Sequence, residues 1–147
     1  MNNKFKEVVI VSAVRTPIGS FRGSLKNMKS HHLGSIVIKE VLKRSKFNKD
    51  EIDEVIMGQV LTTGAGQNPA RQAAINANIP ISKTAHIINQ VCGSGLRAVI
   101  SGYQSIKLGE STSIISGGQE NMSITPHSIF YRDEKKISED KLLDTMI

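Results

Sequence analysis

The only cysteine of the chain, Cys92, is the residue whose type and setting point most directly to chemistry. It follows the short apolar run Ile87–Ile88 and precedes a stretch with helical periodicity. A thiol at a strand-to-helix junction meets free backbone N–H groups and the positive end of the helix dipole, and both favour the reactive thiolate. Gly93 and Gly95 leave room for an acyl group beside the sulfur and for an oxyanion near backbone donors. The pattern predicts a nucleophile, with a small buried hydrophobic residue as the alternative.

The elements that would position Cys92 alternate between apolar strands and amphipathic helices. The expected strands are residues 8–11, 55–57, 85–89 and 114–115, and the expected helices start behind Ser30, at Asn68–Pro69 and at Leu96, the last one ending at Gly109. Strands separated by helices predict an α/β fold with a mostly parallel sheet flanked by helices on both faces. Ligands bind beyond the carboxyl ends of such strands, where Cys92 falls.

Composition predicts one domain from a reducing compartment. The 147 residues are 39% hydrophobic, which is enough for a sizeable core. One cysteine excludes an internal disulfide framework, and a charged start without a long apolar stretch predicts neither a signal peptide nor a membrane helix. We therefore expect a cytoplasmic protein. The net charge of +6 would suit an acidic partner, either nucleic acid or a phosphorylated small molecule, but the basic residues are scattered and aromatic residues make up only 4%. A solvated basic surface is therefore favoured over nucleic-acid binding.

Four blocks of the sequence carry a family pattern. They are Val11–Phe21, Gly66–Ala73, Val91–Leu96 and Gly117–Ser123. In order and spacing they resemble the thiolases, and within that family the bacterial acetyl-CoA acetyltransferases. The resemblance implies that Cys92 attacks an acyl-CoA thioester, carries the acyl group and lends its backbone N–H to an oxyanion hole. It also implies the N-terminal half of a layered α/β/α/β/α fold, with residues 1–120 as a core half and 121–147 as the incomplete start of a loop domain.

The reaction implied by the resemblance condenses two acetyl-CoA into acetoacetyl-CoA and coenzyme A, and its reverse is thiolysis. Coenzyme A thioesters are then substrates, and neither a metal nor another cofactor is expected, because oxyanion stabilisation and positioning carry the step. In the family, a C-terminal half supplies an activating histidine and a second cysteine. The histidines of this chain do not match that base; they are His31, His32, His86 and His127. We therefore expect the isolated chain to be inactive.

Two further functions stay open for the same scaffold. A condensing enzyme of the ketoacyl synthase type would use carrier-protein substrates, although the second and fourth blocks favour a thiolase. A catalytically silent assembly module would instead associate through the strand at residues 85–89. A lone half exposes apolar helix surface, so we expect a homo-oligomer or a complex with the missing half. Residues 132–140 depart from the family pattern in a region linked to tetramers, which leaves dimer and tetramer both open.

Overall fold

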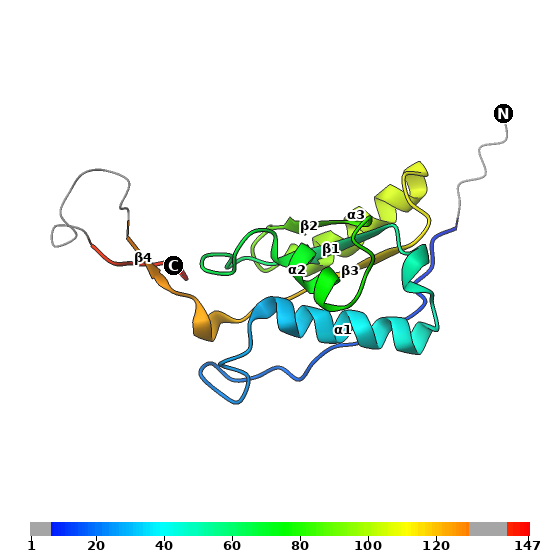
Figure 1. Cartoon of the computed structure of the whole chain (residues 1–147). Coiled ribbons are helices and arrows are strands. Elements are labelled where there is room, and N and C mark those ends of the chain that lie inside the picture. The colour runs from blue at the N-terminus through cyan, green and yellow to red at the C-terminus, as the bar shows by residue number, and fades with distance from the viewer. Residues whose placement is uncertain (1–6, 130–140) are drawn as a thin grey trace.

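The computed structural model describes residues 7–129 and 141–147. Within them, helices and strands form three layers (Figure 1). The elements are α1 (Ser30–Ser45), η1 (Lys49–Glu51), β1 (Glu54–Gly58), α2 (Pro69–Asn76), β2 (Thr84–Ile88), α3 (Ser94–Leu108), β3 (Ile114–Gly118), η2 (Met122–Ile124), β4 (His127–Ser128) and β5 (Leu143–Asp144). The segment 132–140, on which the question of tetramers rests, lies outside the described residues.

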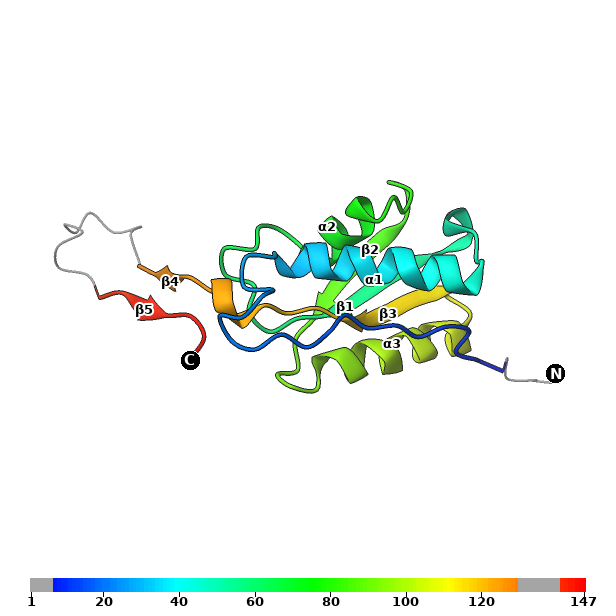
Figure 2. The same cartoon turned by 90° about the horizontal axis from the view of Figure 1, so that it is seen from below.

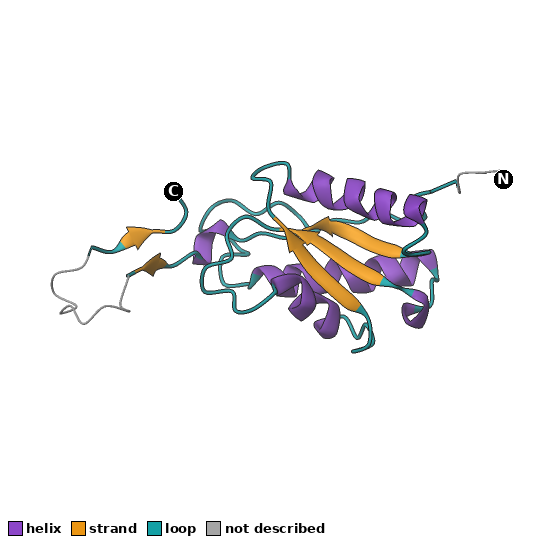
Figure 3. Cartoon of the chain, turned by 90° about the horizontal axis from the view of Figure 1, so that it is seen from above, coloured by secondary structure: helices purple, strands orange, loops and turns teal. Residues whose placement is uncertain are grey.

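The central sheet has the order β2-β1-β3, and all of its strands are parallel. Glu54 lies opposite both Thr84 and Ile114, so the three carboxyl ends meet at one edge. Helices α1 and α2 cover one face and α3 covers the other (Figure 2). The same layering is visible from the opposite side in Figure 3. The predicted parallel α/β architecture is therefore confirmed.

Local signals set the helix boundaries. Pro69 is the first residue of α2, and the Asn68 side chain caps this helix by accepting a hydrogen bond from the Arg71 N–H at 3.1 Å. Gly109 ends α3 in the left-handed conformation, with φ of 80°. The start of α1 differs from the prediction, because Ser30 is its first residue and Lys29 is the N-cap, without a side-chain cap.

The predicted strand at residues 8–11 is wrong for the described structure. Val9, Ile10 and Val11 are 67%, 80% and 64% exposed, and the segment belongs to no strand. Figure 2 shows it passing the sheet without joining it. A β-branched run favours extended backbone, but a strand also needs a partner for its N–H and C=O groups. No segment in the described ranges provides one, so the sheet has three strands rather than four.

The main core lies between the sheet and helices α1 and α2. Val55 and Met57 project from β1 into a buried cluster with Ile38 of α1 and with Ala73 and Ala74 of α2. These side chains are all at most 1% exposed. The cluster fixes the sheet from one side and leaves the other face to α3.

Helix α3 contacts the sheet through small residues. Its buried positions, Ser94, Ala98 and Gly102, recur every fourth residue. A Cβ atom at Gly102 would lie 2.5 Å from Ser116 Oγ, so the helix sits close to the strands. Several larger apolar residues of α3 face outward instead; Leu96, Val99, Ile100 and Tyr103 are between 38% and 68% exposed, and Leu108 is 75% exposed. This apolar face is uncovered in the described structure.

The pair β4–β5 is antiparallel and lies apart from the sheet, beyond its carboxyl edge (Figure 1). The predicted boundary at residue 120, between the core half and the start of the loop domain, falls between the central sheet and the pair β4–β5. It stays a prediction. In the described residues, no helix is both long and apolar enough to cross a membrane.

Candidate active site

Cys92 lies in the short turn that joins β2 to α3, at the carboxyl edge of the sheet. Gly93 is the N-cap of the helix, and Ser94 is its first residue. The predicted strand-to-helix junction is therefore present. The cysteine is free and exposed, so it is not the small buried hydrophobic residue of the alternative interpretation. Its role as a nucleophile stays a prediction.

The backbone of this turn is strained at the residue before the cysteine. Val91 has a φ of 49°, in the left-handed region that β-branched residues rarely adopt. Such a conformation costs about 1–3 kcal/mol and persists only where its surroundings enforce it. Ser94 Oγ donates to Val91 O at 2.6 Å and accepts from the Gln90 N–H at 2.9 Å. On the other side of the turn, Asn89 Oδ1 accepts from the Val91 N–H at 3.0 Å.

Two glycines at strand ends set the height of this turn above the sheet. A Cβ atom at Gly58, the last residue of β1, would lie 2.3 Å from Ser94 C and 2.5 Å from Gly95 N. A Cβ at Gly118, the last residue of β3, would lie 3.4 Å from Gly95 Cα. The first turn of α3 therefore rests directly on the strand backbones.

Gly58 is the positioning residue that the sequence interpretation missed. An isolated glycine at the end of a buried apolar strand is a known signal for close approach of another backbone, and it could have been used here. The glycines that were singled out, Gly93 and Gly95, have more room. A Cβ built at Gly93 would lie 3.3 Å from Gln90 O, and one built at Gly95 would lie 3.8 Å from Gly118 Cα. That these glycines leave space for an acyl group beside Cys92 stays a prediction.

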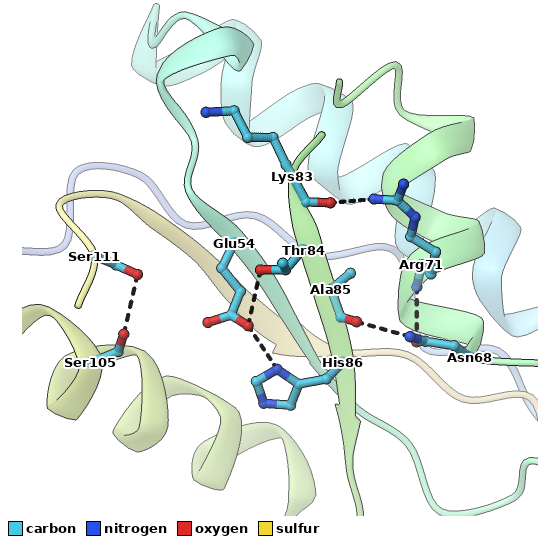
Figure 4. A network of polar contacts seen from close by, with 9 residues as sticks. All are labelled: Glu54, Asn68, Arg71, Lys83, Thr84, Ala85, His86, Ser105 and Ser111. Atoms are coloured by element: carbon cyan, nitrogen blue, oxygen red, sulfur yellow. Dashed lines mark hydrogen bonds and ion pairs between the residues drawn. The ribbon is translucent and has the colours of Figure 1, made fainter. Parts of the chain in front are cut away.

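The histidines lie on other elements, and in the described residues none is hydrogen-bonded to Cys92. His86 Nδ1 is 2.9 Å from Glu54 Oε1, near the amino ends of the strands (Figure 4), whereas Cys92 lies at the carboxyl edge. His31 is buried in α1 with its Nδ1 unpartnered. Burial, and then the positive charges of His32 and Lys29, lower the pKa of His31. The described part of the chain contains no group of three or more potential metal ligands.

The second sequence block, Gly66–Ala73, supports the strand that leads to Cys92. Asn68 Nδ2 donates to Ala85 O at 2.8 Å. Arg71 donates to Ile81 O at 2.6 Å and also to Lys83 O. These carbonyls belong to alternate residues and therefore share the outer side of β2 and of the segment before it. Figure 4 shows the contacts to Lys83 and Ala85. The block thus holds the edge strand against α2.

The fourth block, Gly117–Ser123, joins the end of β3 to the segment after β1. Gln119 Nε2 donates to the buried Gln59 Oε1 at 2.9 Å, and the Gln119 N–H donates to Gly58 O at 3.0 Å. Glu120 Oε2 accepts from the N–H groups of Val60 and Leu61, at 2.8 and 3.1 Å. The fourth block thus joins the segments after β3 and β1 by hydrogen bonds, at the edge of the sheet where Cys92 lies.

Known proteins share both the sequence and this arrangement. The family model described as "Thiolase, N-terminal domain" matches residues 8–147. An acetyl-CoA acetyltransferase of Paracoccus denitrificans is 50% identical over 141 residues, which are 96% of this chain and 36% of that protein. The cytosolic acetyl-CoA acetyltransferase of Rattus norvegicus is 50% identical over 147 residues, which are 100% of this chain and 37% of that one.

Two solved structures are similar to this chain in both fold and sequence. The Acat5 thiolase of Ascaris suum, crystallised in complex with coenzyme A, superposes with a TM-score of 0.90 at 42% identity, over 97% of this chain and 37% of that one. The acetyl-CoA acetyltransferase of Bacillus anthracis gives a TM-score of 0.92 at 36% identity, over 99% of this chain and 37% of that one. The chain thus spans little more than a third of the length of these relatives. It belongs to the thiolase family and carries the pattern of the N-terminal domain.

Proposed function

We propose that the protein carrying this chain is an acetyl-CoA C-acetyltransferase with Cys92 as its nucleophile. The observation that carries the proposal is the exposed cysteine on a strained turn at the carboxyl edge of the sheet. In a parallel α/β sheet this edge is where ligands bind. The names of the similar proteins and the coenzyme A complex of the Ascaris suum thiolase support the same substrate class.

The proposed reaction has two steps. The sulfur of Cys92 attacks the carbonyl carbon of acetyl-CoA, the bond from that carbon to the coenzyme A sulfur breaks, and coenzyme A leaves with a proton. A second acetyl-CoA, deprotonated at its methyl carbon, then attacks the acetyl-cysteine, and the cysteine sulfur leaves as acetoacetyl-CoA forms. The Cys92 N–H stabilises the oxyanion that each attack creates.

The proton acceptors for both steps belong, in this proposal, to a part of the enzyme outside these 147 residues. None of the histidines of the chain is hydrogen-bonded to Cys92 in the ranges that the structure describes, and the chain has no second cysteine. A homo-oligomer, or a complex with a C-terminal half, is therefore the proposed functional form. We propose a cytoplasmic location and expect neither nucleic acid nor a membrane as a partner. We expect no cofactor besides the coenzyme A substrates.

The family match favours this proposal over a ketoacyl synthase with carrier-protein substrates. A silent assembly module remains the second candidate, because β2 is an edge strand of the sheet. Side chains from Asn68 and Arg71 occupy its outer carbonyls as far as Ala85. Pairing with another strand would therefore start beyond that residue.

Thiolysis of acetoacetyl-CoA by the intact protein tests the proposal. Replacing Cys92 with alanine is expected to lower kcat by roughly 10⁴-fold or more, since loss of a nucleophile removes the covalent route. The isolated chain is expected to be inactive in the same assay. Full activity of the Cys92→Ala protein would contradict the assigned nucleophile, and an inactive wild-type protein would favour the assembly module.

A further inference from the structure

We infer that Asn89 is a positioning residue for acyl transfer, because its side chain fixes the backbone at Val91 and thereby the place of the Cys92 sulfur. The inference rests on the proposed function of Cys92. Asn89 is the first residue after β2, three residues before the cysteine. Asn89 lies outside the four sequence blocks that resemble the thiolases, and it has had no role in the account so far.

The first contact is with the strained residue itself. Asn89 Oδ1 accepts a hydrogen bond from the Val91 N–H at 3.0 Å. This bond, from a side chain to the backbone two residues on, is an Asx turn, which replaces a backbone hydrogen bond and stabilises tight turns. Val91 has a φ of 49°, which a β-branched residue adopts only under constraint. Without the acceptor, the turn loses the bond that holds the peptide next to Cys92.

The second contact anchors the Asn89 side chain. Its Nδ2 donates to Val60 O at 3.3 Å, in the segment that follows β1. The Val60 N–H in turn donates to Glu120 Oε2 at 2.8 Å, in the segment that follows β3. The three strand ends are therefore linked in series, from Glu120 through Val60 and Asn89 to Val91. The exposed Asn89 amide is thereby linked to the segments that follow β1 and β3.

Only a side-chain amide of this length makes both contacts. An aspartate would keep the acceptor for Val91 but lose the donor to Val60, and it would bring a negative charge near a sulfur that must be a thiolate. A serine hydroxyl can accept from a backbone N–H two residues on, in the weaker ST turn, but it is too short to bridge two segments. Serine thus restores the first contact without the second.

The rate at which acetyl-CoA acetylates Cys92 in the intact protein tests the inference. Asn89→Ala loses both side-chain hydrogen bonds, and we expect its maximal rate to fall about tenfold, mostly because the acceptor for the Val91 N–H is lost. The acetyl-CoA concentration at half-maximal rate should stay unchanged, because Asn89 positions the sulfur and does not bind substrate. Asn89→Ser should recover to within about threefold of wild type, since it keeps the acceptor. Asn76→Ala, at an exposed asparagine that ends α2, is the matched control and should acetylate at the wild-type rate.

The outcomes separate the two proposals. If the wild-type protein were not acetylated at Cys92, both the proposed function and this inference would be contradicted. Normal acetylation of Asn89→Ala would overturn the inference alone. The inference would also be overturned if Asn89→Ala changed only the acetyl-CoA concentration at half-maximal rate, because Asn89 would then contact the substrate. An Asn89→Ser protein as slow as Asn89→Ala would also overturn it, because the restored acceptor would then have no effect.

Discussion

Replacing Gly58 with alanine tests whether the sheet fixes the position of the nucleophile. The new Cβ would lie 2.3 Å from Ser94 C, 2.5 Å from Gly95 N and 2.6 Å from Ser94 O. Carbon atoms in ordinary contact are about 3.5 Å apart, so the start of α3 must move by roughly 1 Å. All three neighbours are backbone atoms, and no change of side-chain rotamer can relieve the overlap.

The displacement should affect both stability and chemistry. Overpacking of this kind typically lowers the free energy of unfolding by about 1–3 kcal/mol, and we expect Gly58→Ala near the upper end because only backbone can yield. A shift of about 1 Å at a reacting group can cost roughly 100-fold in rate. We therefore expect urea unfolding to show the loss of stability, and Cys92 acetylation by acetyl-CoA to slow by about that factor.

Gly117→Ala is the matched control, since it changes the neighbouring strand by the same single methyl group. No atom lies within 4 Å of a Cβ built at Gly117, and its φ is not in the left-handed region. Its free energy of unfolding should stay within about 0.5 kcal/mol of wild type, with an unchanged acetylation rate. If Gly58→Ala behaved like this control in both measurements, the close approach of β1 to α3 would not position Cys92, and the reasoning would be refuted.

Three further predictions concern stability and assembly. Glu120→Ala should lower the free energy of unfolding by about 2–3 kcal/mol in urea, because two backbone N–H groups lose a charged acceptor, while Glu120→Gln keeps an acceptor and should lose clearly less. Equal losses would contradict this account. In the folded protein the pKa of His31 is lowered from its ordinary value of 6.5, so the unfolded chain binds more protons between the two pKa values. The contribution of His31 to the free energy of unfolding should therefore be fully present above pH 6.5 and be lost as the pH falls through the lower folded pKa. The free energy of unfolding of His31→Gln should vary less over this pH range. A pH profile of the variant as steep as that of wild type would exclude the histidine as the cause. The apolar face around Leu96 and Val99 predicts that the 147-residue chain self-associates, so sizing chromatography should give an oligomer that Leu96→Lys weakens, and a monomeric wild type would count against it.

Local signals in the sequence were sufficient to predict most of the fold. Asn68–Pro69 marks a helix start through capping and a fixed proline φ, and Gly109 marks a helix end through the left-handed conformation. Apolar runs between these signals predicted the three strands of the parallel sheet. The same reasoning placed Cys92 at the junction of β2 and α3, where the structure has it.

The features that sequence reasoning missed depend on contacts between distant segments. Residues 8–11 have strand-like composition, but pairing is decided by a partner, and the described residues supply none. The glycine at the end of the apolar strand signals that some backbone comes close, but only the fold decides that this backbone is the start of α3. The left-handed Val91 is likewise enforced by Asn89 and Ser94, and valine itself disfavours that conformation. The geometry of the site therefore depends on contacts between distant segments, in addition to the local signals that set the helices and strands.

Peptide mapping by mass spectrometry tests the central claim most directly. After brief incubation of the intact protein with acetyl-CoA and rapid acid quenching, the peptide that contains Cys92 should carry one acetyl group on the sulfur. Prior alkylation of the cysteine should abolish the modification. An acetyl group on another residue, or a Cys92 that stays unmodified while coenzyme A is released, would contradict the account.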